Sequence, residues 1–523
     1  MPPVGLAYVA AAIKSAGHEL TVIDAVGEGL DQIRRIWGTG MQVYGISVPE
    51  ILSRIPTDVE MIGVSCMFSS EWFYHQYLIE EIRRAFPKVV IVVGGEHATA
   101  EWKNILRVCG AVDYCVLGEG ESTIVELART IQIGADPRLV PGVSGRHAGV
   151  PTQGPPRQRS ATLDALARPA WDDFPIQNYL RCGYSVTSTN RPAIPVVATR
   201  GCPFRCSFCT AADMWGQEMS LRRPSDVVDE IEHYVDKYEI KHIELMDIAG
   251  FINKKWTKDF LRELIDRRLP ISWLHTAGTR SELLEEDVLR ACKDSGVLKI
   301  LYAPESGSKE TLRRIQKRVD LSRLVASMKM ANRVGISMRA PLLFGFPGQT
   351  MREAFENVFF AFKMVLIGVD DIVVSAFTAY PGSENYRDLV KRGKIDIESI
   401  VASGKYGEFL SGTRTNRLSG HRSWSEHIPS WTLPFFQLGI MGSTQLLRII
   451  LRPSRLFASV KRVLWDRRPL TLPEYAVYRL LKLEWLKSLL NPPPFDGWRP
   501  SLENSTRTLG APAERLTSKR NAL

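Results

Sequence analysis

Three cysteines within eight residues constrain this chain more than any other feature of its sequence. Cys202, Cys206 and Cys209 have the spacing C-x-x-x-C-x-x-C and follow the apolar run 194–198, which predicts a short buried strand that ends in a loop at Gly201. Thiolates select soft centres such as zinc, copper(I) or iron–sulfur clusters. A structural zinc site would need a fourth Cys or His at short spacing, and none follows here. Three thiolates instead suit an iron–sulfur cluster that keeps one iron free.

At these residues the chain resembles the radical S-adenosylmethionine (SAM) superfamily, whose motif is C-x-x-x-C-x-aromatic-C, with Phe208 in the aromatic place. The resemblance implies a [4Fe–4S] cluster held by Cys202, Cys206 and Cys209, with SAM on the fourth iron. It also implies that the cluster donates one electron to the sulfonium and releases a 5′-deoxyadenosyl radical. The alternative interpretation is a chance run of buried cysteines.

Size and composition limit the class of protein. A chain of 523 residues predicts two or three domains, and 45% hydrophobic with 24% charged residues is typical of a soluble globular protein. The sequence has no apolar run long enough to predict a transmembrane helix, and its start lacks the basic leader of a signal peptide. Eight cysteines, three of them in one motif, do not indicate a disulfide framework, so we expect a reducing cytoplasm.

Residues 1–135 alternate helical and strand-like patterns, which predicts a doubly wound parallel sheet in an α/β fold. Apolar residues recur at helical spacing in 3–16 and 71–86. The predicted strands are Glu19–Asp24, Met61–Ser65, Val89–Val93 and Tyr114–Leu117. Ligands of such sheets bind beyond the carboxyl ends of the strands, where glycines allow close approach. The residues in these places are Gly94, Gly95, Gly118 and Glu119.

This region is similar to the cobalamin-binding domain that precedes many radical SAM domains. The similarity rests on the segments 2–8, 93–99 and 117–121. It implies that Gly94, Gly95, Gly118 and Glu119 contact cobalamin. The family usually has a strand before the Pro-Pro loop, and here the chain starts at that loop. An Asp-x-His-x-x-Gly motif is absent, so the resemblance implies that no histidine binds cobalt; we expect His18 and His97 at the surface or in turns.

Residues 136–190 are rich in Pro, Gly, Arg and Gln and predict a linker. Strand and helix patterns resume in 191–400, where six strand–helix units predict a partial (β/α)6 barrel with its chemistry at the strand carboxyl ends. The predicted strands are Ile194–Thr199, His242–Asp247, Ser272–Thr276, Lys299–Glu305, Ser337–Phe344 and Asp371–Phe377. Predicted helices between them include Ser225–Lys237, Lys258–Arg267 and Glu285–Asp294.

Several polar residues and glycines stand at these strand ends. Asp247 resembles the family carboxylate that holds the SAM amino group, although the family often has a second acid beside it. The segment 303–308 resembles the family's Gly-x-Glu-Ser-Gly-Ser, with Ala303 in place of the first glycine, which implies that Glu305 and Ser306 lie beside SAM. Gly345 begins a Gly-x-Pro-Gly-Gln turn that the resemblance places near the adenine and ribose. An acid at a barrel rim that binds no ligand is the alternative for Glu305.

The C-terminal part is basic. Residues 441–523 contain 15 Lys and Arg against 6 Asp and Glu, which is +9 of the chain's net charge of +10. Residues 401–490 predict a helical extension that either covers the barrel mouth or lies on a membrane surface as basic amphipathic helices. Residues 491–523 predict a disordered tail. The charge suits an anionic membrane surface or an acidic partner, or it is simply solvated; we expect no nucleic acid.

Together these patterns predict an enzyme, a cobalamin-dependent radical SAM protein that methylates an unactivated carbon in a biosynthetic pathway. A second possibility is an enzyme with the same cofactors that cyclises, oxidises or rearranges its substrate. A regulatory protein that senses cobalamin or a cluster would not need Asp247 and Glu305. A methylthiotransferase would usually carry further N-terminal cluster cysteines and a small RNA-binding barrel. The expected partners are a small-molecule substrate such as a lipid or pigment precursor, an electron donor such as flavodoxin or ferredoxin, and a peripheral inner-membrane contact through the basic tail.

Overall fold

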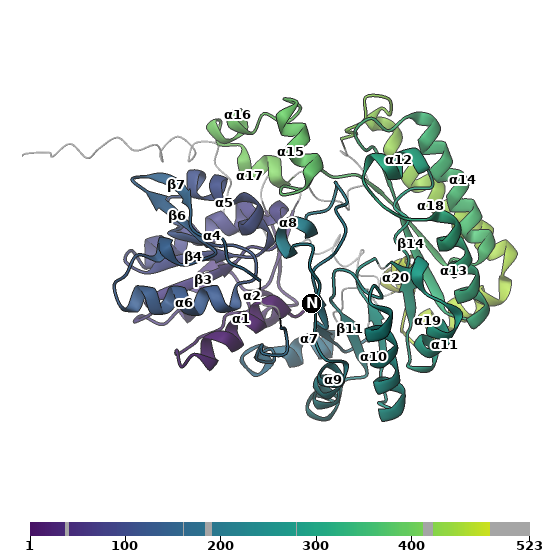
Figure 1. The fold of residues 1–523 in the computed structure, drawn as a ribbon, viewed down its shortest axis with the longest axis horizontal. Helices are drawn as coiled ribbons and strands as arrows, with labels where there is room; N and C mark the ends of the chain where they lie inside the picture. Colours follow the sequence, from purple (N-terminus) through teal and green to yellow (C-terminus); the bar gives the residue numbers. More distant parts are fainter. Residues whose placement is uncertain (37–40, 160–161, 184–190, 279, 412–421, 482–523) are drawn as a thin grey trace, which may run out of the picture.

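The computed structural model describes residues 1–36, 41–159, 162–183, 191–278, 280–411 and 422–481. An N-terminal α/β domain lies beside a larger domain of parallel strands and helices, and further helices follow at the C-terminal side (Figure 1). None of the helices in these ranges is both long and apolar enough to cross a membrane. The predicted tail 491–523 lies outside the described residues.

The N-terminal domain is built on a five-stranded sheet. Its first three strands are parallel, and its last two form an antiparallel hairpin at one edge. In spatial order the strands are β3 (Met61–Ser65), β4 (Val90–Gly94), β5 (Tyr114–Val116), β6 (Val143–His147) and β7 (Val150–Gln153). The predicted linker therefore differs from the structure, because β6 and β7 extend the N-terminal sheet well beyond residue 135.

Both faces of this sheet are covered by helices. Successive residues of β4 point to opposite faces, so Val92 packs in one apolar cluster while Ile91 and Val93 pack in another. The first cluster includes residues of α1 (Val4–Ser15) and α6 (Glu121–Gln132), and the second includes residues of α4 (Trp72–Ala85) and α5 (Glu96–Val108). The doubly wound arrangement predicted from the sequence is confirmed.

The predicted strand at residues 19–24 was wrong. This segment is irregular, and β3 is an edge strand of the described sheet, so the segment pairs with no strand there. Its last residue, Asp24, instead caps α2 (Ala25–Glu28) by accepting a hydrogen bond from the Gly27 amide at 2.9 Å. The Asp24 carboxylate also accepts a hydrogen bond from the Tyr179 hydroxyl at 2.8 Å, in α7 (Ile176–Cys182). A small hairpin of β1 (Ile33–Arg35) and β2 (Gln42–Tyr44) and the helix α3 (Val48–Arg54) follow.

The second domain contains the six predicted barrel strands as two parallel three-stranded sheets. A bridge between Trp273 and Val297 connects them into one partial barrel. The strands are β8 (Ala193–Val196), β11 (His242–Leu245), β12 (Ser272–His275), β13 (Lys299–Leu301), β14 (Ser337–Phe344) and β15 (Asp371–Ala376). The helices between them are α9 (Pro224–Tyr238), α10 (Lys254–Arg267), α11 (Glu286–Asp294), α12 (Lys309–Arg314), α13 (Leu321–Val334) and α14 (Met351–Ile367).

The helices after the barrel do two different things. After α15 (Glu384–Lys391) and α16 (Ile397–Ala402), the short helix α17 (Tyr406–Ser411) packs Tyr406 and Leu410 into the core of the N-terminal domain. The helices α18 (Leu433–Leu451), α19 (Pro453–Leu464) and α20 (Leu472–Leu481) then run along the outside of the barrel, where α18 packs on α14 and β15. A helical extension was predicted, but the packing of α17 on the N-terminal domain was not.

Candidate cofactor site

The cysteine loop connects the short strand β9 (Thr199–Arg200) to the helix α8 (Ala211–Trp215), beyond the carboxyl end of β8. After α8, β10 (Ser220–Leu221) returns to pair antiparallel with β9. Backbone hydrogen bonds fix it at its centre. The Ser207 amide donates to the Ile315 carbonyl at 3.0 Å, and the Asn385 amide donates to the Ser207 carbonyl at 2.8 Å. These bonds tie the loop to the opposite half of the barrel, so the loop lies across the strand ends where barrel chemistry takes place.

The three cysteines fit a shared cluster better than a single metal ion. All are free thiols; Cys202 and Cys206 are half-buried and Cys209 is exposed. Burial raises the pKa of the Cys206 thiol, and Cys202 is close enough to raise it further. In the described ranges, no group of three or more His, Cys, Asp or Glu side chains could hold one metal ion. A four-iron cluster is wider than one ion, so its three thiolates need not meet at a point.

Phe208 connects the loop to the glycine turn after β14. Its ring contacts the Phe346 ring edge-on, with 5.8 Å between centroids, and Phe346 stacks on Phe377 at 4.7 Å. In the turn itself, Gly345 has a φ of +86°, a conformation that favours glycine. Its amide donates to Oε1 of Gln349 at 2.8 Å. The predicted residues Phe208 and Gly345 are thus brought to one place.

Gln349 offers a polar group toward a ligand. Its side chain is buried, and its Nε2 has no hydrogen-bond partner within the described residues. A buried amide donor without a partner is costly, so it indicates a missing partner at this position. A bound nucleoside such as that of SAM would supply acceptors. The sequence motif contained Gln349, but its side chain was not singled out.

Glu305 stands in an unusual backbone conformation at the end of its strand segment. Its φ is +60°, which a non-glycine residue rarely adopts and which is common at ligand sites. Its carboxylate lies 3.3 Å from Nζ of Lys317. Lys317 and Arg280 both lower the pKa of Cys206, which places two cations next to the cysteine loop. Sequence reasoning missed both cations because they lie outside the short motifs.

Ser306 has an internal role in this structure. Its hydroxyl is buried and donates to Oδ1 of Asn357 at 2.6 Å, and it accepts a hydrogen bond from the Ser308 amide at 3.1 Å. The Gly307 amide also donates to Asn357 at 2.7 Å. These contacts hold the turn that carries Glu305, so Ser306 acts on the site through its neighbour.

Asp247 is buried at the end of β11, and both of its oxygens already accept hydrogen bonds. The donors are the Ala198 amide and the Thr199 hydroxyl, each at 2.8 Å. Burial raises its pKa, while the neighbouring His275 lowers it. The carboxylate thus fixes the segment that enters the cysteine loop, and its contact with the SAM amino group stays a prediction. Asp247, Thr199 and His275 line one side of a small cavity that continues beneath α10.

The predicted cobalamin residues lie at the carboxyl edge of the N-terminal sheet. A Cβ on Gly94 would meet only Val116, at 3.9 Å, whereas a Cβ on Gly95 would lie 2.7 Å from the Cys66 carbonyl oxygen. The space beside Gly94 is therefore open, whereas a side chain at Gly95 would collide with the backbone of Cys66. Met67 and Phe68 follow β3 at this edge with 44% and 57% of their surface exposed. An open, partly apolar edge of this kind fits the face of a large cofactor.

Gly118 and the two histidines complete this edge. Gly118 has a φ of +71°, and its amide donates to Oγ1 of Thr99 at 2.9 Å. His97, expected at the surface or in a turn, is instead buried against Trp72, with Nδ1 2.9 Å from Oγ of Ser69. His18 lies in the irregular segment after α1.

Two acids of the Gly-Glu-Gly-Glu segment reach across to the barrel. Glu121 forms a buried ion pair with Arg200 at 2.6 Å. Glu119 lies 3.7 Å from Arg200 and 2.9 Å from Arg159. Glu119 was predicted to contact the cofactor, but here its carboxylate is engaged by two arginines. A second contact joins Thr210, which follows the last cysteine, to Glu96. The carboxyl edge of the N-terminal sheet is therefore in contact with the cysteine loop of the barrel domain.

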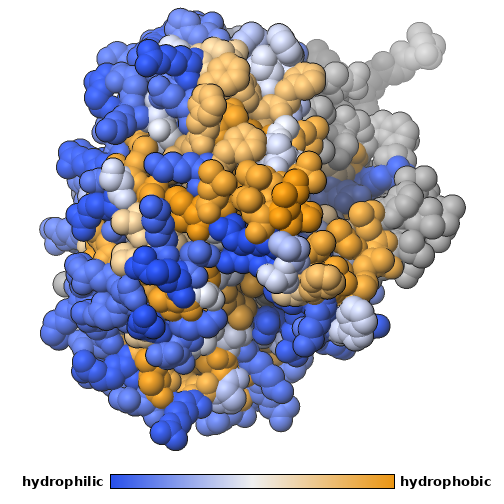
Figure 2. Space-filling view, turned by 90° about the vertical axis from the view of Figure 1, so that its right-hand side faces the viewer, coloured by the Kyte–Doolittle hydropathy of each residue, from blue (hydrophilic) through white to orange (hydrophobic). Residues whose placement is uncertain are grey.

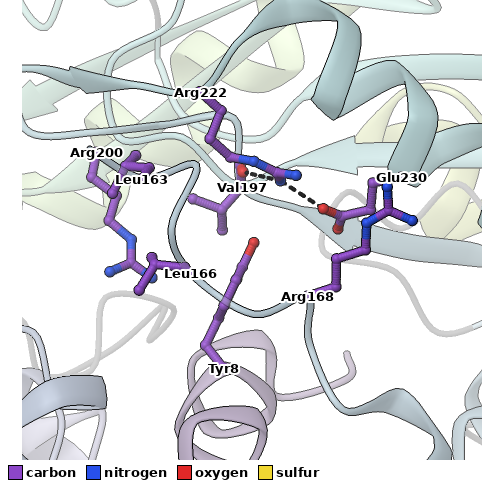
Figure 3. Close-up of a pocket in the computed structure, with 8 residues that line it drawn as sticks. All are labelled: Tyr8, Leu163, Leu166, Arg168, Val197, Arg200, Arg222 and Glu230. Carbon is purple, nitrogen blue, oxygen red and sulfur yellow. Dashed lines mark hydrogen bonds and ion pairs between the residues drawn. The ribbon is translucent and has the colours of Figure 1, made fainter. Parts of the chain in front are cut away.

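The Arg200 contact borders a small cavity between the domains (Figure 3). Tyr8 points into it from α1, one of the segments that resemble the cobalamin-binding family. Arg222 forms an ion pair with Glu230 at 2.6 Å and donates to the Val197 carbonyl at 3.1 Å. The Arg200 guanidinium lies 5.2 Å from the centroid of the Tyr8 ring. The Tyr8–Arg200 contact thus joins the two domains at this cavity, while the contacts of Arg222 lie within the barrel domain.

The sequence matches two known families, one for each domain. Residues 1–128 match the B12 binding domain and residues 196–361 match the radical SAM superfamily. An uncharacterized methyltransferase of Pyrococcus horikoshii is 28% identical over 383 residues, which is 73% of this chain and 77% of that protein. An anaerobic magnesium-protoporphyrin IX monomethyl ester cyclase of Rubrivivax gelatinosus is 25% identical and covers 74% of this chain and 66% of its own length.

Two further matches extend the comparison. A hopanoid C-3 methylase of Methylococcus capsulatus is 24% identical over 492 residues, 90% of this chain and 87% of that protein. The solved structure of the radical SAM methyltransferase TsrM of Kitasatospora setae, with cobalamin and a [4Fe-4S] cluster bound, superposes with a TM-score of 0.60. The two share 19% sequence identity over 75% of each chain, so the likeness is one of fold.

Proposed function

The chain belongs to the radical SAM enzymes that carry an N-terminal B12-binding domain, and we propose that it transfers a methyl group to an unactivated carbon of a small biosynthetic substrate. The observation that supports the proposal most is the contact between the two strand-end edges. Thr210, next to Cys209, binds Glu96, next to Gly95. A radical source on one domain and a methyl donor on the other must reach the same substrate carbon, and this contact brings their predicted sites together.

When bound, the cluster with SAM supplies a 5′-deoxyadenosyl radical and cobalamin supplies the methyl group. Cys202, Cys206 and Cys209 would hold the cluster. The Glu305 carboxylate would bind SAM at its ammonium or ribose hydroxyls, and the free Nε2 of Gln349 would donate to its nucleoside.

Other residues shape and close the site. Phe208 and Phe346 would keep water from the cluster. Gly94 and Gly118 would leave room for the face of cobalamin, with Met67 and Phe68 beside it.

A second candidate keeps both cofactors but cyclises or oxidises its substrate. The similarity to an anaerobic cyclase over 74% of the chain supports it. For either reaction we propose a cytoplasmic enzyme that takes electrons from a flavodoxin or ferredoxin, because one-electron reduction of the cluster requires a donor. The substrate would be a small molecule such as a lipid or pigment precursor.

One experiment distinguishes these reactions. The protein is reconstituted anaerobically with iron, sulfide and hydroxocobalamin and incubated with reductant, candidate substrates and SAM that carries a deuterated methyl group. Methyl transfer predicts a product heavier by one deuterated methyl group, together with 5′-deoxyadenosine and S-adenosylhomocysteine. A product of altered mass without the label would establish the second candidate and overturn the first.

A further inference from the structure

The outward faces of α14 and α18 are apolar where a surface helix is normally polar. On α18 the exposed side chains include Phe435, Leu438, Leu446 and Ile450, which recur at helical spacing. The only charged residue of this helix, Arg448, is buried. The helix is therefore apolar on both sides, because Leu433 and Ile440 pack in the core while these four side chains face solvent.

Helix α14 extends this surface. Phe355 and Phe359, one turn apart, are 50% and 72% exposed. The Phe355 ring contacts the Phe436 ring of α18, so the two helices present one continuous surface. We call the six side chains Phe355, Phe359, Phe435, Leu438, Leu446 and Ile450 the outer apolar face. Figure 2, which views the molecule from the side of α14 and α18, shows a broad apolar patch there. Monomeric proteins rarely expose a patch of this kind without a binding partner.

The positive charge around this face indicates which kind of partner can bind there. Residues 430–481 contain eight Lys and Arg and two Asp and Glu, a net charge of +6. Lys363, one turn after Phe359 on α14, is exposed, and so is Lys461 on α19. Residues 482–523 of the same chain carry +3, and a second copy would bring another +6. Both would be repelled by this region, whereas an anionic lipid surface would be attracted to it.

We propose that the outer apolar face docks on the surface of an anionic lipid bilayer. Aromatic and aliphatic side chains would enter the boundary between headgroups and acyl chains, as in an interfacial helix, and the flanking lysines would contact anionic headgroups. The sequence placed membrane contact in the basic tail. It also gave membrane contact as one alternative for the helices of residues 401–490, which include α18. The described residues support α18 for this contact and add α14, for which the sequence predicted no such role.

This surface is continuous with the candidate SAM site. Leu433, at the start of α18, lies 3.4 Å from the position that a Cβ on Gly345 would take. Phe436 stacks on Phe344, the last residue of β14, at 5.0 Å. An apolar substrate that leaves the bilayer near Phe435 would therefore arrive next to the predicted SAM turn. This part of the inference rests on the proposed function and assigns the substrate to the lipid-soluble class.

Vesicle sedimentation with the full-length protein tests the docking. The probes are vesicles of phosphatidylcholine with phosphatidylglycerol and vesicles of phosphatidylcholine alone, without substrate. The test variant is Phe359→Ser with Phe435→Ser, whose side chains are 72% and 71% exposed. The matched control is Ile133→Ser with Leu139→Ser on the N-terminal domain, 77% and 72% exposed. We expect the wild type and control to bind the anionic vesicles, and the test variant to bind about a hundredfold more weakly, roughly tenfold per aromatic side chain.

Three results would overturn the proposal. One is equal vesicle binding by the test variant and the wild type. Another is loss of all binding on truncation after Leu481, because the C-terminal segment would then be the binding element. The third is a wild-type protein that is a dimer without vesicles, measured by light scattering, together with a test variant that is a monomer. Iron content and SAM cleavage are measured in every variant, so a failure of docking is distinguished from a failure of the proposed chemistry.

Discussion

The carboxylate of Glu305 lies 3.3 Å from the ammonium group of Lys317, and both groups lie close to Cys206. The left-handed backbone at Glu305 directs an acid to this place, although that conformation costs about 1–3 kcal/mol for a residue with a side chain. Because such a cost is retained at the rim of a predicted cluster, we propose that the carboxylate binds a ligand there.

We predict that Glu305→Gln weakens SAM binding by about tenfold or more, because a neutral amide replaces a charge-assisted partner worth roughly 1.5–3 kcal/mol. Iron and sulfide content should not change. Equilibrium dialysis of SAM against the reconstituted protein measures the effect, with the exposed Glu310→Gln of α12 as the control. SAM affinity equal to wild type would show that Glu305 does not contact the cofactor.

Gly94→Val is predicted to lower hydroxocobalamin binding at least about tenfold while leaving the fold intact. A Cβ at this position meets only Val116 at 3.9 Å, so the added methyl groups would enter the space proposed for cobalamin. Gly63→Val in β3 is the matched control, because a Cβ there has nothing within 4 Å and lies away from the strand end. Absorbance of the bound corrin gives the readout. Normal corrin uptake by the Gly94 variant would mean that cobalamin binds elsewhere.

Arg200→Met should lower the free energy of unfolding by about 3–5 kcal/mol, because it leaves the buried carboxylate of Glu121 without its ion-pair partner at the junction between the domains. The double variant with Glu121→Gln should recover part of this loss, since the unpaired charge is then removed as well. Thermal unfolding of the wild type and both variants measures the differences. If the double variant is less stable than Arg200→Met alone, the ion pair with Glu121 does not account for the stability that Arg200 contributes.

Stability should depend on pH through Lys299, which is buried in β13 with Nζ 2.8 Å from the Leu470 carbonyl. Burial lowers its pKa to about 7. Between pH 7 and about 10 the unfolded chain binds more protons at this lysine than the folded chain, so the free energy of unfolding rises with pH in that window. The effect amounts to at most about 4 kcal/mol.

Lys299→Met should therefore raise the melting temperature near pH 7 and lose that advantage as the pH approaches 10. The exposed Lys391→Met of α15 serves as the control and should change little at either pH. Melting curves across this range provide the test. A difference between Lys299→Met and wild type that is independent of pH would contradict the lowered pKa.

The motifs and the strand–helix alternation allowed the two-domain α/β fold and the residues around the cysteine loop to be predicted. Ser337–Phe344 is a strand over the predicted range because alternate residues are buried along it. The segment 19–24 has the composition of a strand but pairs with none in the described sheet, which composition alone does not reveal. The strands β6 and β7 were missed because glycine, proline and arginine obscure their pattern.

Contacts between distant segments were the other part that sequence reasoning could not reach. Lys317 and Arg280 lie outside the short motifs, and only the folded barrel brings them to Cys206. Glu119 was predicted to contact cobalamin, and in the structure it lies next to Arg159 and Arg200. Both arginines are distant from Glu119 in the sequence, so no local sequence pattern predicts these contacts.

The iron and sulfide content of the anaerobically reconstituted protein tests the central claim most directly. We predict about four iron and four sulfide per chain in the wild type, and none above background when Cys202, Cys206 and Cys209 are all replaced by alanine. Cys182→Ala, which removes an exposed thiol outside the loop, should keep the wild-type content. Iron and sulfide unchanged in the triple variant would contradict the assignment of the cluster to this loop.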